Sequence, residues 1–229
     1  MSTAKTELDI QPECSPLPPR HDSSNALARP GLALVMKRVI DVVLASICLC
    51  LLMPVLAGIA LLVKLQDGGS VLYRRRVVGP TGSFDAFKFR SMCLNAADLL
   101  DQDPSLRKKF QANFKLKTDP RVTPIGARLR KYSLDELPQL FNVLSGQMSL
   151  VGPRMITLEE LEKYGQFQNP LMSVKPGLTG YWQVNGRQEV DYAHRVAMDI
   201  YYIQNWSLRL DFAILLRTPW KVLKGEGAV

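Results

Sequence analysis

The sequence predicts a helix-rich α+β protein that combines a membrane-embedded, re-entrant helix with a cytosolic domain and interfacial amphipathic helices. Three observations support this prediction. The apolar run 39–63 is long enough for a membrane segment. A turn signal divides the alternating segment 71–92, which indicates a short strand or hairpin. Much of the remaining chain spaces its apolar residues as helices do.

Residues 1–35 form a predicted N-terminal tail. Prolines, serines and mixed charges occur there without an apolar period, which is typical of disorder. The tail is not expected to be a secretory signal, because the apolar run begins too late and no clear small-residue cleavage site follows it.

Residues 36–66 form the predicted membrane segment. A spanning helix needs about 20 apolar residues, and the run supplies them with Asp41 as its sole charged residue. Pro54 interrupts the run and would remove a helix hydrogen bond. Both flanks are basic, with Lys37-Arg38 before the run and Arg74-Arg75-Arg76 after it, so the positive-inside rule gives no orientation. A helix that bends at Pro54 and leaves on the face it entered satisfies both flanks; a single spanning helix is the alternative.

Residues 67–229 are predicted to form one cytosolic domain. The segment 71–92 contains the turn Gly79-Pro80-Thr81-Gly82. Helical spacing follows at 92–116, at 134–144 and at 155–166, and a turn-rich loop is expected at 175–180. In the second of these helices, one face is expected to carry Leu134, Leu137, Phe141 and Leu144. The stretch 191–223 predicts amphipathic helices whose Tyr and Trp residues suit a bilayer interface, although ordinary core-packing helices explain the pattern equally well.

The composition narrows the function classes. The 229 residues carry 29 Lys and Arg against 21 Asp and Glu, a net charge of +8, which suits anionic partners. Lipid and phosphate are favoured over nucleic acid, because the chain has no zinc-finger spacing, no RNP-type aromatic motif and no basic heptad helix. Its four cysteines form no paired framework, so we expect reduced thiols on a cytosolic face. Its two histidines are too few for zinc, so a metal ion would be a hard cation on carboxylate oxygen.

Asp135 and Glu136 are the most informative residues of the sequence. Two adjacent carboxylates among dispersed cations suit a site that handles phosphate, where arginines bind phosphate oxygens and a carboxylate attacks phosphorus or holds a metal ion. The structural alternative is a capping box formed by Ser133-Leu134-Asp135-Glu136. The two interpretations are compatible, because a helix N-terminus keeps carboxylates ionised and attracts phosphate.

Three cations could serve this site. Lys88 and Arg90 share one face if their segment is extended, and such a pair can grip a diphosphate from one side; a solvated basic face is the alternative. Arg154 follows Gly152-Pro153, a rigid turn that could aim its guanidinium, although an arginine after a turn is more often simply exposed.

Six motifs occur in order along the chain. They are Lys37-Arg38 with Asp41, the apolar run broken by Pro54, Lys88-Phe89-Arg90-Ser91-Met92, Ser133-Leu134-Asp135-Glu136-Leu137-Pro138-Gln139, Gly152-Pro153-Arg154 and Lys175-Pro176-Gly177-Leu178-Thr179-Gly180. Together they resemble the motifs of the bacterial sugar transferases, the monotopic phosphoglycosyl transferases, and Trp182-Gln183-Val184-Asn185-Gly186-Arg187 fits as well. The resemblance covers about residues 36–229 and is nearest to the undecaprenyl-phosphate galactose phosphotransferases of exopolysaccharide synthesis.

The resemblance implies a reaction and its residues. A sugar 1-phosphate would pass from a nucleotide sugar, such as a UDP-hexose, to polyprenyl (undecaprenyl) phosphate, releasing a nucleoside monophosphate and priming exopolysaccharide synthesis. Asp135 would be the nucleophile and Glu136 would help bind Mg²⁺. The cations expected to bind phosphate oxygens are Lys88, Arg90, Arg130 and Arg154. The resemblance also implies a re-entrant helix in the bacterial inner membrane, with the catalytic domain in the cytoplasm.

The chain departs from the family pattern at three positions. Met53 stands where many members have serine before the bend proline, so the carbonyl freed by Pro54 needs another partner. Met155 stands where many have proline after Gly-Pro-Arg, and Val77 where an arginine is common. Two rival functions stay open: a membrane glycosyltransferase that forms a glycosidic bond and releases nucleoside diphosphate, and a non-catalytic scaffold of a polysaccharide machine. The sequence leaves the sugar and the oligomeric state open.

Overall fold

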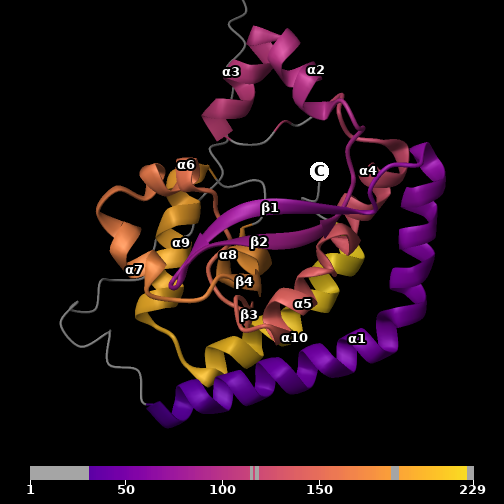
Figure 1. The fold of residues 1–229 in the computed structure, drawn as a ribbon. Coiled ribbons are helices and arrows are strands. Elements are labelled where there is room, and N and C mark those ends of the chain that lie inside the picture. The colour runs from indigo at the N-terminus through magenta and orange to yellow at the C-terminus, as the bar shows by residue number, and fades with distance from the viewer. Residues whose placement is uncertain (1–30, 114–115, 117–118, 187–190, 226–229) are drawn as a thin grey trace, which may run out of the picture.

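The computed structural model describes residues 31–113, 116, 119–186 and 191–225 (Figure 1). The predicted disordered tail lies outside these residues up to residue 30. The elements in chain order are α1 (Gly31–Asp67), β1 (Leu72–Gly79), β2 (Gly82–Phe89), α2 (Ala96–Gln102), α3 (Pro104–Asn113), α4 (Pro124–Lys131), η1 (Leu134–Glu136), α5 (Gln139–Leu144), β3 (Ser149–Val151), α6 (Leu158–Leu161), η2 (Glu162–Phe167), α7 (Gln168–Met172), β4 (Gly177–Thr179), α8 (Tyr181–Asn185), α9 (Tyr192–Gln204) and α10 (Leu208–Lys224), where η marks 3₁₀ helices. The predicted helix-rich α+β class is confirmed.

α1 is a long, bent helix at one edge of the molecule. Figure 1 shows it running along the base of the domain and then turning upwards at the right. Pro54 lies inside α1, where a proline removes a hydrogen-bond donor and causes a kink. The helix is long and apolar enough to cross a membrane. It begins at Gly31, within the segment that the sequence analysis assigned to the tail.

One face of α1 packs on the domain, against α5, β2 and β3. The opposite face exposes large apolar side chains, of which Leu51 and Leu65 are each 73% exposed. Apolar exposure on this scale indicates association with a membrane. The buried residues recur at helical spacing and are Asp41, Ala45, Leu49, Leu56, Ile59 and Val63.

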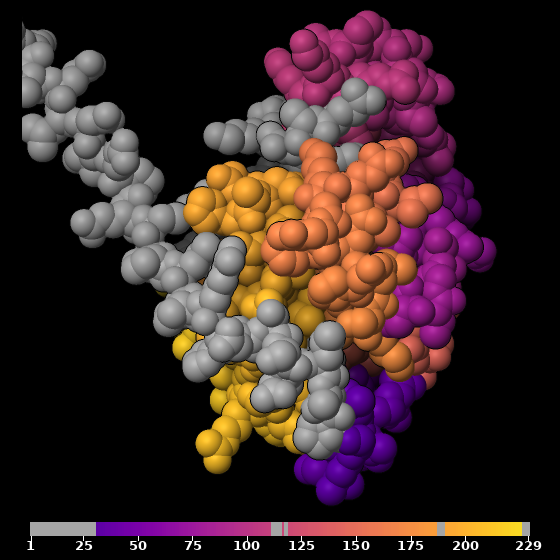
Figure 2. Space-filling model, turned by 90° about the vertical axis from the view of Figure 1, so that its left-hand side faces the viewer, coloured from indigo at the N-terminus to yellow at the C-terminus, as the bar shows by residue number. Residues whose placement is uncertain are grey.

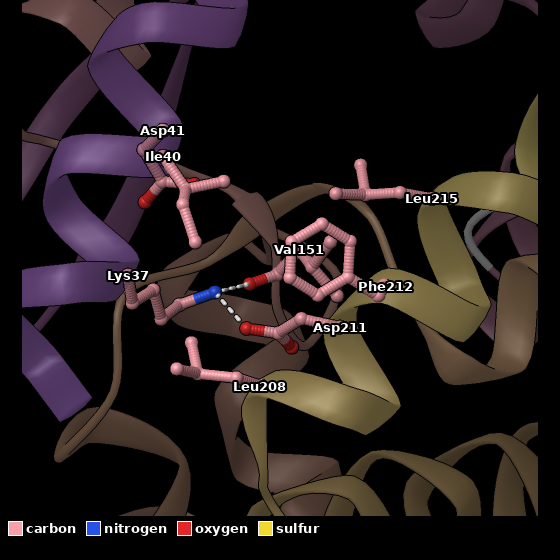
Figure 3. Close-up of a pocket in the computed structure, with 8 residues that line it drawn as sticks. All are labelled: Lys37, Ile40, Asp41, Val151, Leu208, Asp211, Phe212 and Leu215. Atoms are coloured by element: carbon pink, nitrogen blue, oxygen red, sulfur yellow. Dashed lines mark hydrogen bonds and ion pairs between the residues drawn. The ribbon is translucent and has the colours of Figure 1, made fainter.

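The first charged residue of α1, Lys37, is bound by the domain (Figure 3). Its Nζ donates to Asp211 Oδ2 at 2.7 Å and to the carbonyl oxygen of Val151 at 2.9 Å. Asp211, in α10, also accepts from the Tyr202 hydroxyl at 2.7 Å and from the Trp206 indole at 3.1 Å. We call Lys37, Asp211, Tyr202 and Trp206 the docking cluster, because these residues join α1, α9 and α10.

Arg38 and Asp41 fix the same half of α1. Arg38 donates to the carbonyl oxygens of Val143 and Leu144, at 2.6 and 2.8 Å, and so satisfies the last turn of α5. Asp41, only 4% exposed, accepts from the N–H of Leu150 at 3.0 Å. The sequence analysis treated Lys37-Arg38 as a flank at the membrane surface, whereas in the structure both side chains bind the domain.

The strand or hairpin predicted at 71–92 is a hairpin. β1 and β2 pair antiparallel, with Leu72 opposite Phe89 and Gly79 opposite Gly82. The predicted turn joins them, and Gly82 adopts a φ of 109°, which glycine tolerates.

A second small sheet forms where the sequence analysis expected only a loop. β4 lies within 175–180 and pairs parallel with β3, Ser149 opposite Gly177 and Val151 opposite Thr179. Parallel partners far apart in the chain leave no local turn signal between them, so this pairing has no signature in either segment alone.

The helical segments are confirmed, with one error in detail. α2 and α3 occupy 92–116 and lie at the end of the molecule opposite the first half of α1 (Figures 1 and 2). α6 and η2 occupy 155–166, and α9 and α10 occupy 191–223. The predicted helix at 134–144 is divided into η1 and α5. As a result Phe141 is 49% exposed, while Leu140 and Val143 are buried, so the predicted apolar face is wrong at Phe141.

Candidate active site

Asp135 and Glu136 lie in η1, a tight turn between α4 and α5. Ser133, just before it, has a φ of 53° and is the sole non-glycine residue with positive φ in the described part of the chain. Its side chain makes no capping hydrogen bond, so the capping box that was the structural alternative for Ser133 and Glu136 does not form. A capping box forms instead at Thr157 and Glu160. The carboxylate pair therefore lacks the structural explanation that competed with a chemical one.

Asn142 fastens α5 to β2. It is fully buried; its Oδ1 accepts from the N–H of Phe87 at 3.0 Å, and its Nδ2 donates to the carbonyl oxygen of Asp85 at 2.8 Å. Lys88 follows Phe87 in β2, and Glu136 lies one turn before α5. These two hydrogen bonds of Asn142 thus hold Lys88 opposite Glu136, and no pattern in the sequence predicted them.

Glu136 gathers two of the predicted cations. Its Oε1 lies 2.5 Å from Lys88 Nζ and 3.8 Å from Arg154 Nη2. The side chains of Lys88, Glu136 and Arg154 are 13%, 17% and 25% exposed. Three separate elements, β2, η1 and the segment after β3, therefore converge on one partly buried ionic site.

The position of Arg154 is fixed by the close contact of two glycines, Gly152 and Gly177. A Cβ atom on Gly177 would lie 2.1 Å from the nitrogen of Gly152, and one on Gly152 would lie 2.6 Å from the carbonyl oxygen of Lys175. The N–H of Gly177 donates to the carbonyl oxygen of Pro153 at 2.8 Å, and Arg154 pairs with Gly177 in a parallel bridge. The motifs Gly-Pro-Arg and Lys-Pro-Gly thus meet backbone to backbone, which only glycine allows.

A buried carboxylate supports Arg154 from behind. Asp199 in α9 is fully buried; its Oδ1 accepts from the N–H of Arg154 at 3.4 Å, and its Oδ2 accepts from the Tyr164 hydroxyl at 2.8 Å. Burial raises the pKa of Asp199 to about 6, against the opposing effect of Arg195. The sequence analysis missed Asp199, which has the spacing of any polar residue on a helix.

The two neighbouring carboxyl groups have different acidities. Burial raises the pKa of Glu136, but Lys88 and Arg154 outweigh it and lower that pKa to about 2. Burial raises the pKa of Asp135, Lys88 opposes the rise, and the charge of Glu136 adds to it. Glu136 is therefore a fixed anion, whereas Asp135 is the more basic of the two.

Asp135 also differs in its partners. Its residue is 7% exposed, and within the described ranges no ion pair to its carboxylate is found. Arg130 is its predicted neighbour: burial lowers the pKa of Arg130, and Asp135 is the carboxylate that most opposes this. The Nε of Arg130 is engaged elsewhere, with Ser91 Oγ at 2.9 Å. A carboxylate without an ion pair keeps its oxygen lone pairs available for attack.

Arg90 is not brought to the carboxylate pair. Its guanidinium forms an ion pair with Asp67 at the end of α1 and donates to the carbonyl oxygen of Val63 at 3.4 Å. The residue is 8% exposed. Its observed contacts attach β2 to α1, and its predicted binding of phosphate stays a prediction.

Arg75 is a cation that the sequence analysis did not assign to the site. In β1, it forms an ion pair with Glu160 at 2.8 Å. Its charge also contributes to the low pKa of Glu136 and to the lowered pKa of Lys88. The run Arg74-Arg75-Arg76 was visible in the sequence, but strand alternation alone did not show which arginine faces the carboxylates.

The donor set fits a hard divalent cation. Mg²⁺ is usually bound through one or two carboxylates together with substrate phosphates and water. Glu136 Oε1 is held by Lys88 and Arg154, and the ion pairs of the described residues leave Oε2 uncommitted. No cluster of three or more His, Cys, Asp or Glu side chains occurs in the parts of the chain that are described.

Comparison with known proteins identifies the family. The family described as "Bacterial sugar transferase" matches residues 32–225. The chain is 47% identical over 197 residues to the "Exopolysaccharide production protein ExoY" of Rhizobium meliloti, which covers 84% of this chain and 87% of that protein. It is 46% identical over 198 residues to the "Undecaprenyl-phosphate galactose phosphotransferase" of Salmonella typhimurium, and 40% over 207 residues to the "UDP-glucose:undecaprenyl-phosphate glucose-1-phosphate transferase" of Escherichia coli.

The relatives differ in length from this chain. The match covers 84% of this chain but 41% of the Salmonella protein, and 86% of this chain but 42% of the Escherichia coli protein. The chain therefore spans less than half the length of these relatives. It belongs to the bacterial sugar transferase family, and the resemblance seen in its motifs is confirmed.

Proposed function

We propose that this bacterial sugar transferase moves a sugar 1-phosphate from a nucleotide sugar to undecaprenyl phosphate, the priming step of exopolysaccharide synthesis. Three relatives support this by name: the exopolysaccharide production protein and the galactose and glucose-1-phosphate transferases. The observation that carries the proposal is the contrast within the carboxylate pair. Glu136 is neutralised by two cations, while Asp135 is more basic and has no ion pair within the described residues.

Asp135 is the nucleophile of the proposed first step. Its carboxylate attacks the phosphorus that bears the sugar, an acyl phosphate bond between Asp135 and that phosphorus forms, and the bond to the leaving phosphate oxygen breaks. The nucleoside monophosphate leaves with that electron pair. Lys88 and Arg154 bind the phosphate oxygens, since charge-assisted hydrogen bonds from lysine and arginine stabilise phosphate charge.

The lipid phosphate completes the reaction. An oxygen of undecaprenyl phosphate attacks the same phosphorus, the bond to Asp135 breaks, and the carboxylate is regenerated. The product is a lipid-linked sugar diphosphate. Splitting one transfer into two displacements requires a nucleophile that also leaves readily, and a carboxylate meets both demands.

Glu136 would help hold Mg²⁺ through the oxygen that its ion pairs leave free. A bound Mg²⁺ would supply charge neutralisation at the diphosphate of the substrate. Lys88, which lies 2.5 Å from the other oxygen, fixes the orientation of the Glu136 carboxylate.

The membrane path of α1 is part of the proposal. The bend with Pro54 and the apolar outer face support a re-entrant helix that returns to the cytoplasmic face of the bacterial inner membrane. The side chains that fix α1 on the domain support this path, because they hold the proposed membrane helix against the domain that carries the carboxylate pair. Cysteine labelling of the tail from outside intact cells would contradict this orientation.

A product assay tests the reaction class. Membranes containing the protein are incubated with UDP-galactose or UDP-glucose and undecaprenyl phosphate, and the released nucleotide is identified. We expect UMP and a lipid-linked sugar diphosphate. Release of UDP would favour a glycosyltransferase that forms a glycosidic bond, and the absence of turnover with hexose and amino-sugar donors would favour the scaffold.

A further inference from the structure

The ring of Trp182 contacts Arg195, an arginine to which the proposed reaction assigns no role. The guanidinium carbon of Arg195 lies 5.0 Å from the centre of the Trp182 ring and 5.1 Å from that of Tyr192. Arg154, which contacts Glu136, lies 5.5 Å from the same Trp182 ring. Two guanidinium groups therefore gather on one buried indole, and one of them belongs to the active site.

The donors around this ring are unused. Nε and Nη2 of Arg195 and Nε1 of Trp182 are buried, and none of the three has a hydrogen-bond partner among the described residues. Trp182 is only 8% exposed. Buried N–H groups without acceptors are rare and costly in folded proteins. Two of the three belong to the Arg195 cation, and the third belongs to the ring that this cation contacts, so the group favours an acceptor that carries negative charge.

The nearby carboxylates do not fill that role. Asp199 lies one turn after Arg195 on α9, but its two oxygens accept from Arg154 and Tyr164. No ion pair between Arg195 and a described acidic residue is found. Aromatic rings, which hold a guanidinium without consuming its hydrogen-bond donors, position Arg195 instead.

We propose that Arg195 and Trp182, together with Arg154, form a second phosphate subsite beside the Asp135–Glu136 pair. A planar guanidinium presents paired donors that match phosphate oxygens, and a desolvated one binds more strongly than an exposed one. The phosphate that binds there belongs either to the nucleotide part of the donor or to the lipid acceptor. This inference rests on the proposed function for the identity of the ligand, but not for the presence of the subsite.

Binding of inorganic pyrophosphate tests the subsite without turnover. The full-length protein in lipid nanodiscs is titrated by calorimetry, as wild type, R195Q and R195K, with Mg²⁺ present throughout. We expect R195Q to weaken pyrophosphate binding about 10-fold or more, because one charge-assisted contact is lost. R195K should weaken it less, because an ammonium keeps the charge but not the paired donors.

The control is R107Q, at an exposed arginine paired with Asp101 outside the site. It should bind pyrophosphate as the wild type does. Wild-type affinity in folded R195Q would overturn the proposal and leave Arg195 as a structural residue. If R195Q does not fold, R195K decides: weakened binding supports the subsite, and unchanged binding overturns it.

Steady-state kinetics then assign the phosphate. A raised KM for the nucleotide sugar in R195K, with KM for undecaprenyl phosphate unchanged, places the donor in the subsite; the reverse places the acceptor there. A lower melting temperature with both KM values unchanged contradicts the subsite. If the wild type releases no UMP, the proposed function fails, while the pyrophosphate titration still decides whether the subsite exists.

Discussion

Lys37 and Lys88 are similar in their immediate surroundings. Each is a partly buried lysine, 14% and 13% exposed, whose ammonium lies 2.7 Å from Asp211 and 2.5 Å from Glu136 respectively. Around Lys37 the charges are satisfied, since Asp211 accepts from Lys37, Tyr202 and Trp206. Around Lys88 they are not, because extra cations converge there and the neighbouring carboxylate has no ion pair in the described chain.

The difference separates an ionic site that stabilises the fold from the site to which we assign substrate binding. A fully bonded buried network stabilises one arrangement, whereas a buried donor or charge without a partner is costly until a ligand supplies one. Mutations in the docking cluster should therefore lower the free energy of unfolding, whereas mutations at the carboxylate site should lower activity.

Replacement of the proposed nucleophile should have the largest effect. D135N should lower kcat by on the order of 10⁴-fold or more, because a neutral amide is neither a nucleophile nor a leaving group for phosphorus. Transfer of label from the sugar phosphate of the donor to the protein should also disappear. The melting temperature should not fall, since Asp135 makes no ion pair in the described structure. Substantial turnover by D135N would remove Asp135 as the nucleophile.

Removal of the proposed Mg²⁺ should have the second-largest effect. Excess chelator should lower turnover on the order of 10³-fold, because a metal ion contributes several kcal/mol of transition-state stabilisation. Added Mg²⁺ should restore turnover. The melting temperature should stay nearly constant, because the docking cluster uses no metal. Full activity in excess chelator would refute the role of Glu136 as a metal ligand.

Disruption of the docking cluster should produce the opposite pattern. D211A leaves the ammonium of Lys37 without its carboxylate, so the free energy of unfolding should fall by about 3 kcal/mol. Turnover per folded molecule should change less than about 3-fold, because Asp211 is not part of the proposed reaction. Chemical denaturation in nanodiscs measures the first quantity, and R209A, at an exposed position of α10, is the control. An unchanged unfolding free energy in D211A would end the contrast between the two lysines.

The smallest effect concerns pH. Attack requires ionised Asp135, whose pKa is raised, so kcat/KM should fall as the pH drops through a value above the ordinary aspartate pKa of about 3.9. Glu136, with a pKa of about 2, stays ionised throughout. The K88M variant loses a positive charge that lowers the pKa of Asp135. The residual kcat/KM of K88M should therefore fall at a higher pH than that of the wild type. A wild-type midpoint below the ordinary pKa of aspartate would contradict the assignment.

Local signals predicted much of the fold. The Gly79-Pro80-Thr81-Gly82 turn predicted the hairpin, and apolar spacing predicted α2, α3, α9 and α10. The face of α5 was wrong at Phe141, because a left-handed Ser133 and the 3₁₀ turn after it shift the register, and neither has a periodic signal. The β3–β4 pairing was missed because parallel partners meet only in the folded chain.

The same division applies to the site. The adjacency of Asp135 and Glu136, the positive charge around them and the bend at Pro54 are properties of the sequence, since each depends on neighbours in the chain. Tertiary structure alone decided that Lys88 and Arg154 reach Glu136 while Arg90 turns to Asp67, because strand pairing and helix docking determine which side of the fold each long side chain reaches. It also decided that Lys37 serves the fold and that Arg195 joins Arg154 on Trp182, because burial and partners, not residue type, determine what a charge does.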